Sequence, residues 1–121
     1  MSKVILVIED QEDNRRILRD LLNSVDYEVI EAVTGEDGVR SAIAHQPDLI
    51  LMDIQLPDFD GYEATRRIKA NPALTPVPII AVTSYALSGD DVKAFEAGCD
   101  AYVTKPYSPR ALLAKIREYF A

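Results

Sequence analysis

The feature that most constrains the fold of this chain is a regular alternation between two kinds of segment. Short apolar runs rich in β-branched residues are typical of strands that are buried on both faces of a parallel sheet. Each run is followed by a longer segment whose apolar residues recur every three or four positions, as on one face of a helix. Because strands and helices alternate, we predict one parallel sheet with right-handed crossovers and helices on both faces. The predicted strands are Val4–Ile8, Glu28–Val33, Leu49–Met52, Val77–Val82 and Ala101–Thr104.

Capping residues and apolar stripes indicate five helices between and after these strands. A Thr, Asp or Ser that can accept a hydrogen bond from the amide three positions on favours helix starts at Thr34, Asp60, Ser88 and Ser108. Asp10 can cap the first helix in the same way. The residues that we expect to face the core are Ile17, Leu18, Leu21, Leu22 and Val25 in the first helix, Val39, Ala42 and Ile43 in the second, which covers about 35–45, and Leu112, Leu113, Ile116 and Phe120 in the fifth.

Composition narrows the class of protein. The 121 residues suit a single domain, 1–121, and 20 acidic against 13 basic residues give a net charge of −7. A nucleic-acid partner is not expected, because such binders need a basic face. The single cysteine, Cys99, suits a reducing compartment. The apolar run Val4–Ile8 is too short for a signal peptide or a membrane span, so we expect a soluble cytoplasmic protein.

Polar side chains follow four of the five predicted strands. In open α/β sheets ligands bind beyond the carboxyl ends of the strands, so these side chains are expected to meet at one edge. They are Glu9 and Asp10 after the first strand, Asp53 after the third, Thr83 and Ser84 after the fourth, and Lys105 with Pro106 after the fifth.

This set of side chains predicts phosphoryl chemistry with a divalent cation. Clustered carboxylates repel one another unless a cation neutralises them, and Mg²⁺ prefers oxygen ligands. A lysine and a hydroxyl nearby can bind a phosphoryl group. A carboxylate in such a site can also act as a nucleophile and form an aspartyl phosphate.

Four stretches then resemble the receiver domains of bacterial two-component response regulators. They are Val7-Ile8-Glu9-Asp10, Leu51-Met52-Asp53-Ile54-Gln55-Leu56-Pro57 with Asp60-Gly61, Ala81-Val82-Thr83-Ser84, and Tyr102-Val103-Thr104-Lys105-Pro106. The resemblance covers essentially the whole chain. It implies a doubly wound, flavodoxin-like (βα)5 fold whose five parallel strands have the order 2-1-3-4-5.

The resemblance also implies a role for each matching residue. Asp53 would be the phosphorylation site, and Thr83, Lys105 and Tyr102 would bind the phosphoryl group or switch with it. The bond before Pro106 is expected to be cis. The implied Mg²⁺ ligands are Glu9 (through water), Asp10, Asp53 and the Gln55 carbonyl. Gln55 and Tyr85 would border the water path to the phosphoryl group, where a bulky Tyr85 is expected to slow hydrolysis. Glu9 departs from the aspartate more usual at its position.

The predicted function is that of a signalling switch and not of a turnover enzyme. The phosphoryl donor would be a histidine kinase or a histidine phosphotransfer protein. An output protein would bind the face formed by the fourth helix, fifth strand and fifth helix, and the chain would be monomeric or would dimerise when phosphorylated. The basic residues expected on that face are Lys93, Arg110, Lys115 and Arg117.

Three alternatives stay open from the sequence. The chain is expected to be a stand-alone response regulator, but it could also be a receiver domain of a hybrid histidine kinase or larger regulator. It could be an interaction module that no longer needs phosphorylation. It could also be a magnesium-dependent hydrolase with Asp53 as nucleophile, although its short loops offer no lid. We interpret Asp58 and Asp60 as loop and cap residues, His45 as a surface residue and Cys99 as an unreactive thiol.

Overall fold

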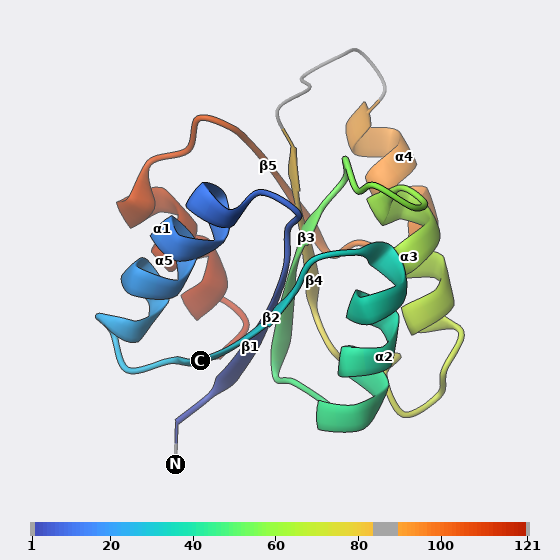
Figure 1. Cartoon of the computed structure of the whole chain (residues 1–121), viewed down its shortest axis with the longest axis horizontal. Helices are drawn as coiled ribbons and strands as arrows, with labels where there is room; N and C mark the ends of the chain where they lie inside the picture. The colour runs from blue at the N-terminus through green and yellow to red at the C-terminus, as the bar shows by residue number, and fades with distance from the viewer. Residues whose placement is uncertain (1, 84–89, 121) are drawn as a thin grey trace.

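The computed structural model describes residues 2–83 and 90–120, which form one parallel sheet between two layers of helices (Figure 1). The strand order is β2-β1-β3-β4-β5, so the predicted doubly wound topology is confirmed. Helices α1 and α5 cover one face of the sheet, and α2, α3 and α4 cover the other (Figure 1). The elements are β1 (Val4–Ile8), α1 (Glu12–Asn23), β2 (Glu28–Ala32), α2 (Gly35–His45), β3 (Leu49–Asp53), α3 (Gly61–Lys69), β4 (Ile79–Thr83), α4 (Asp90–Ala97), β5 (Ala101–Thr104) and α5 (Pro109–Arg117).

The core lies in two layers because successive strand residues face opposite sides of the sheet. In β1, Ile5 and Val7 pack with the residues of α1 and α5, whereas Leu6 and Ile8 pack toward α2, α3 and α4. Every residue of β3 and β4 is buried. This two-sided burial explains why the central strands are continuously apolar in sequence.

The ends of three strands differ from the prediction. β4 begins at Ile79 and not at Val77, because the amide of Val77 donates to the carbonyl of Leu74 in the preceding turn and Pro78 has no amide hydrogen. β3 and β4 each extend one residue further, so Asp53 and Thr83 are their last residues. β2 ends at Ala32, and Val33 is exposed.

Two predicted core residues are on the surface. Ile17 of α1 is 54% exposed, because the helix buries Leu18 and Leu22 and turns the preceding residue toward solvent. Ile43 of α2 is 49% exposed. The buried residues of α2 are Gly35, Gly38 and Ala42, so its buried stripe consists of small residues.

Three of the predicted helix caps are confirmed. Thr34 accepts from the amide of Asp37 at 3.0 Å, Asp60 from Glu63 at 2.9 Å and Ser108 from Ala111 at 3.3 Å. The prediction that Asp10 caps α1 is wrong, because the N-cap is Gln11, whose side chain makes no capping hydrogen bond. The predicted start of the fourth helix at Ser88 lies outside the described residues.

Gly61 begins α3 at a point where the backbone passes very close to the end of β3. A Cβ atom at this position would overlap the carbonyl oxygen of Asp53 and would lie 2.8 Å from the Cα of Ile54. We expect Gly61→Ala to lower the free energy of unfolding by about 1–3 kcal/mol, because backbone atoms cannot move aside cheaply. Chemical denaturation of the full chain measures this effect.

Gly38→Ala is the matched control, because the three atoms nearest to the added methyl group would all belong to the side chain of Ile8. A smaller loss is expected there, since a side chain can change rotamer. Equal losses for the two variants would contradict the backbone explanation.

Candidate functional site

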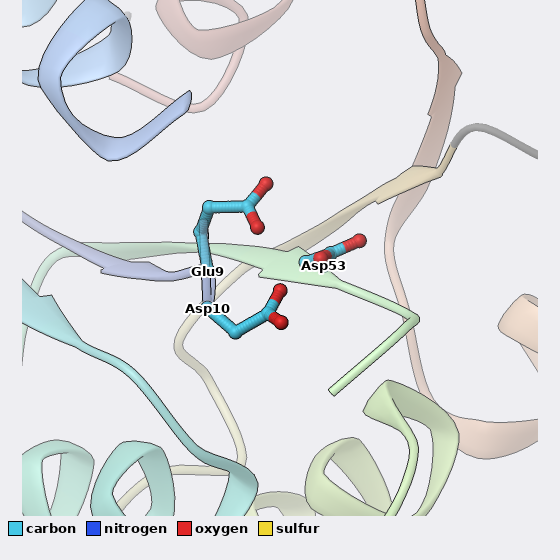
Figure 2. Close-up of side chains that lie close together, drawn as sticks. All are labelled: Glu9, Asp10 and Asp53. Carbon is cyan, nitrogen blue, oxygen red and sulfur yellow. The ribbon is translucent and has the colours of Figure 1, made fainter. Parts of the chain in front are cut away.

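Three carboxylates converge at the carboxyl edge of the sheet. Figure 2 shows Glu9 and Asp10, which follow β1, with their carboxylates directed toward that of Asp53 at the end of β3. One carboxylate oxygen from each residue lies within 4.8 Å of the other two. Glu9 and Asp53 are buried, and Asp10 is partly exposed. Oxygen ligands at this spacing form a suitable set for a hard cation such as Mg²⁺.

The three carboxylates lie in an open cleft of about 490 Å³. Gln55, which is exposed, donates its backbone amide to Asp53 Oδ1 at 3.3 Å. The cleft brings together five residues that the sequence predicted for the functional site, namely Glu9, Asp10, Asp53, Gln55 and Lys105. Its lining consists of Glu9, Asp10, Gln11, Asn14, Asp53, Gln55, Leu56, Pro57 and Lys105.

Lys105 adds a positive charge to the cleft. Its Nζ donates to Glu9 Oε1 at 2.8 Å and lies 3.8 Å from Asp53 Oδ1. Its backbone amide donates to the carbonyl of Thr83 at 2.7 Å, and the peptide bond to Pro106 is cis. The second oxygen of Glu9 accepts from the amide of Gln11 at 3.1 Å. Glu9 is thus the closest acidic partner of Lys105, and both of its oxygens are hydrogen-bonded.

Burial, hydrogen bonds and the crowding of negative charge separate the pKa values of the three acids. Burial, followed by the charge of Glu9, raises the pKa of Asp53 to about 7, and Lys105 only partly opposes this rise. Burial alone would raise the pKa of Glu9, but the hydrogen bonds from Lys105 and Gln11 lower it below its usual value. Burial and the neighbouring Glu9 raise the pKa of Asp10. Because a bound cation favours ionised carboxylates, it would offset both the burial and the repulsion from Glu9 that raise the pKa values of Asp53 and Asp10.

The other predicted site residues lie on the two strands beyond β3. Thr83 is the buried last residue of β4, in register with Thr104 of β5. Tyr102 lies in β5, half-buried against the core layer under α2, α3 and α4. Tyr85 is outside the described residues, so its predicted position beside the water path stays a prediction.

The loop after β3 is anchored to α2 by a contact that the sequence did not indicate. Asp58 accepts from the amides of Gly35 at 2.8 Å and Glu36 at 2.9 Å. These are the first amides of α2, where a negative charge is favourable. Phe59 packs so closely against Gly35 that a Cβ atom added to this glycine would lie 2.5 Å from the ring. The guanidinium of Arg67 lies 4.0 Å from the centroid of the same ring. Asp58 is more than twenty residues from α2 in sequence, so no local pattern could reveal this contact.

The remaining interpretations concern residues away from the cleft. His45 is exposed at the end of α2. Cys99 is buried in the core, and burial raises the pKa of its thiol, as expected for an unreactive cysteine. In the part of the chain that the structure describes, every helix is too short or too polar to cross a membrane.

Comparison with known proteins gives consistent matches. Residues 5–117 match the model of the response regulator receiver domain family. The polar-differentiation response regulator DivK of Brucella ovis is 40% identical over 119 residues, which cover 98% of this chain and 97% of DivK.

Solved structures of receiver domains also match the whole fold. The receiver domain of a sensor histidine kinase from Pseudomonas aeruginosa superimposes with a TM-score of 0.91 at 38% identity and 98% coverage of both chains; it is described with a magnesium ion coordinated in its active site cleft. A CheY-like receiver domain protein from Methanospirillum hungatei gives a TM-score of 0.89 at 35% identity, covering 98% of this chain and 93% of that one.

The raised pKa of Asp53 predicts how stability changes with pH in metal-free buffer. The folded state holds the Asp53 proton up to about pH 7, whereas the unfolded state loses it near 3.8. The favourable contribution of the protonated carboxyl is therefore complete below pH 4 and is lost as the pH rises through 7. We expect Asp53→Asn to be more stable than wild type by about 1–3 kcal/mol at pH 8 and nearly equal to it at pH 4.

Denaturation in urea at both pH values, with a chelator present, measures this difference. Asp20→Asn, which changes an exposed aspartate of α1, is the control and should leave the stability nearly unchanged at both pH values. A stability gain of Asp53→Asn that does not depend on pH would show that charge repulsion is not its cause.

Proposed function

The chain belongs to the response regulator receiver domain family, and from that premise we propose that Asp53 accepts a phosphoryl group from a phosphorylated histidine. Receiver domains are signalling switches of two-component systems and interact with histidine kinases and output proteins. The observation that carries the proposal is the convergence of Asp53 with Glu9, Asp10 and Lys105 in one open cleft. The donor would be a histidine kinase or a histidine phosphotransfer protein.

In the proposed transfer, a carboxylate oxygen of Asp53 attacks the phosphorus in line with the leaving nitrogen. A P–O bond forms, the P–N bond breaks, and the imidazole nitrogen keeps the electron pair and takes a proton from water. Asp53 must be ionised to attack, and the ammonium of Lys105 at 3.8 Å favours that form. Lys105 and the hydroxyl of Thr83 would then bind phosphoryl oxygens, where charge develops in the transition state.

The donor set fits Mg²⁺. Asp10, Asp53 and the backbone carbonyl of Gln55 would hold the ion directly, and Glu9 would contact it through water, because its oxygens already bind Lys105 and the Gln11 amide. When bound, Mg²⁺ supplies positive charge that offsets the carboxylates and the phosphoryl oxygens. The magnesium in the cleft of the Pseudomonas receiver supports this assignment.

Phosphorylation would act by shifting an equilibrium between two conformations. A shift from mostly inactive to mostly active needs about 5 kcal/mol of differential stabilisation. Thr83, Lys105 and Tyr102 would transmit it to the face of α4, β5 and α5. Helix α4 carries two exposed apolar residues, Val92 and Phe95, each 52% exposed, which suit contact with an output protein or a second receiver. We propose that the chain acts as a cytoplasmic, stand-alone regulator that is monomeric or dimerises when phosphorylated.

Acetyl phosphate tests the phosphoacceptor role without knowledge of the kinase. With Mg²⁺ present, we expect intact-mass spectrometry to show one phosphoryl group on wild type, none on Asp53→Asn and none after Mg²⁺ is chelated. Asp20→Asn is the control, because this exposed aspartate of α1 does not line the cleft, and it should be phosphorylated normally.

The same experiment separates the alternative functions. A phosphoprotein that decays slowly supports the receiver. Rapid, repeated hydrolysis of acetyl phosphate would indicate a hydrolase, and a wild-type protein that stays unmodified would indicate an interaction module.

Hydrogen exchange tests the proposed output face. Beryllofluoride, a mimic of the phosphoryl group, should change amide exchange in α4, β5 and α5, because these elements carry the proposed switch. Amides in the middle of α2 serve as the internal reference and should keep their exchange rates. Changes confined to the cleft, or spread equally over α2, would contradict the assignment of the face.

A further inference from the structure

Arg15 of α1 connects three parts of the molecule beside the acidic cleft. Its Nη1 donates to the backbone carbonyls of Glu9 and Asp10, both at 3.0 Å. Its Nε lies 3.5 Å from Glu31 Oε1 on β2, and the side chain is only 16% exposed. The guanidinium thus joins α1 and β2 to the turn that carries the two acids.

The geometry of that turn explains why these contacts matter. In an extended strand, successive side chains point to opposite faces. Here Glu9 and Asp10 are consecutive, yet their carboxylates reach the same cluster with Asp53. Their carbonyls also converge on one nitrogen atom of Arg15. The backbone conformation that satisfies Arg15 is therefore the one that brings both acids into the cleft.

The turn needs such support because its own charges oppose it. Glu9 and Asp53 are both buried, and their carboxylate oxygens lie within 4.8 Å of each other, so like charges on them repel. Hydrogen bonds from a charged guanidinium are about twice as strong as those between neutral groups. Glu31 pairs with the Arg15 guanidinium from β2, so the support of the turn connects α1 to β2. Glu31 also forms a separate, more exposed ion pair with Arg19 at 3.0 Å.

We propose that Arg15 is a positioning residue for the acidic pair. By holding the carbonyls of Glu9 and Asp10, it sets the affinity of the cluster for Mg²⁺ and hence the Mg²⁺ concentration that phosphoryl transfer requires. This inference rests on the proposed function, because it concerns the same cleft.

Arg19 provides a matched control for Arg15. Both arginines lie on α1 and pair with Glu31, but the hydrogen bonds described for Arg19 go to Glu31 and not to the carbonyls of the turn. Calorimetric titration of the full chain with Mg²⁺ should give about 10-fold weaker binding for Arg15→Ala, the usual cost of losing a group that orients metal ligands. Arg19→Ala should stay within about 2-fold of wild type, since it loses only a partly exposed ion pair.

A kinetic measurement distinguishes positioning from a general loss of structure. For Arg15→Ala, the Mg²⁺ concentration that gives half-maximal phosphorylation by acetyl phosphate should rise about 10-fold, in step with the affinity. The rate at saturating Mg²⁺ should stay within about 3-fold of wild type, because Asp53 and Lys105 are unchanged. A general structural defect would lower the saturating rate and leave the Mg²⁺ requirement unchanged.

The outcomes separate the inference from the proposed function. If wild type binds no Mg²⁺, both are overturned. If wild type binds Mg²⁺ and the Arg15 and Arg19 variants lose affinity equally, only the inference is overturned. If Arg15→Ala does not fold, Arg15→Lys takes its place, because an ammonium keeps the charge but not the planar fork that reaches Glu31 and both carbonyls. Wild-type affinity in Arg15→Lys would then overturn the inference.

Discussion

The repulsion among three carboxylates at one sheet edge is the constraint on which the rest of this structure depends. Burial of Glu9 and Asp53 would be costly without partners, since an uncompensated buried charge destabilises a fold strongly. Lys105 and the amides of Gln11 and Gln55 offset part of that cost. The remainder appears as the raised pKa of Asp53. The protein thus keeps a site whose free energy falls when a cation, or a proton, arrives.

The topology makes this crowding possible. β1 lies between β2 and β3, so the chain leaves β1 toward one side of the sheet and later returns to the other. The carboxyl ends of β1 and β3 are therefore adjacent at the point where the strand order reverses, which is where open α/β sheets bind ligands. The turn after β1 and the loop after β3, which flank this point, are each held by a contact that lies outside the cleft. Arg15 holds the turn after β1, and Asp58 anchors the loop after β3 to α2.

Much of this arrangement could be predicted from the sequence, and the exceptions have physical reasons. Strand order and the residues at strand ends follow from local patterns and the family resemblance, because apolar runs and caps are short-range signals. The exposure of Ile17 and Ile43 could not be predicted, since it depends on which stripe of a helix meets the sheet. The contacts of Arg15 and Asp58 were missed for a related reason. They are made to backbone atoms, and a backbone partner leaves no residue type to recognise in the sequence.

The length of Glu9 links the resting site to its chemistry. The family resemblance leads us to expect aspartate at this position, and the aspartate side chain is one methylene shorter. Here the longer side chain reaches Lys105 at 2.8 Å, while Asp53 lies 3.8 Å from the same ammonium. In the proposed function, a phosphoryl group on Asp53 would compete with Glu9 for the ammonium of Lys105. Glu9 would then lose its main counter-charge unless a cation has already entered the cleft. In the proposed function, Mg²⁺ binding and the release of Lys105 from Glu9 would thus be coupled through one carboxylate, and each would make the other less costly.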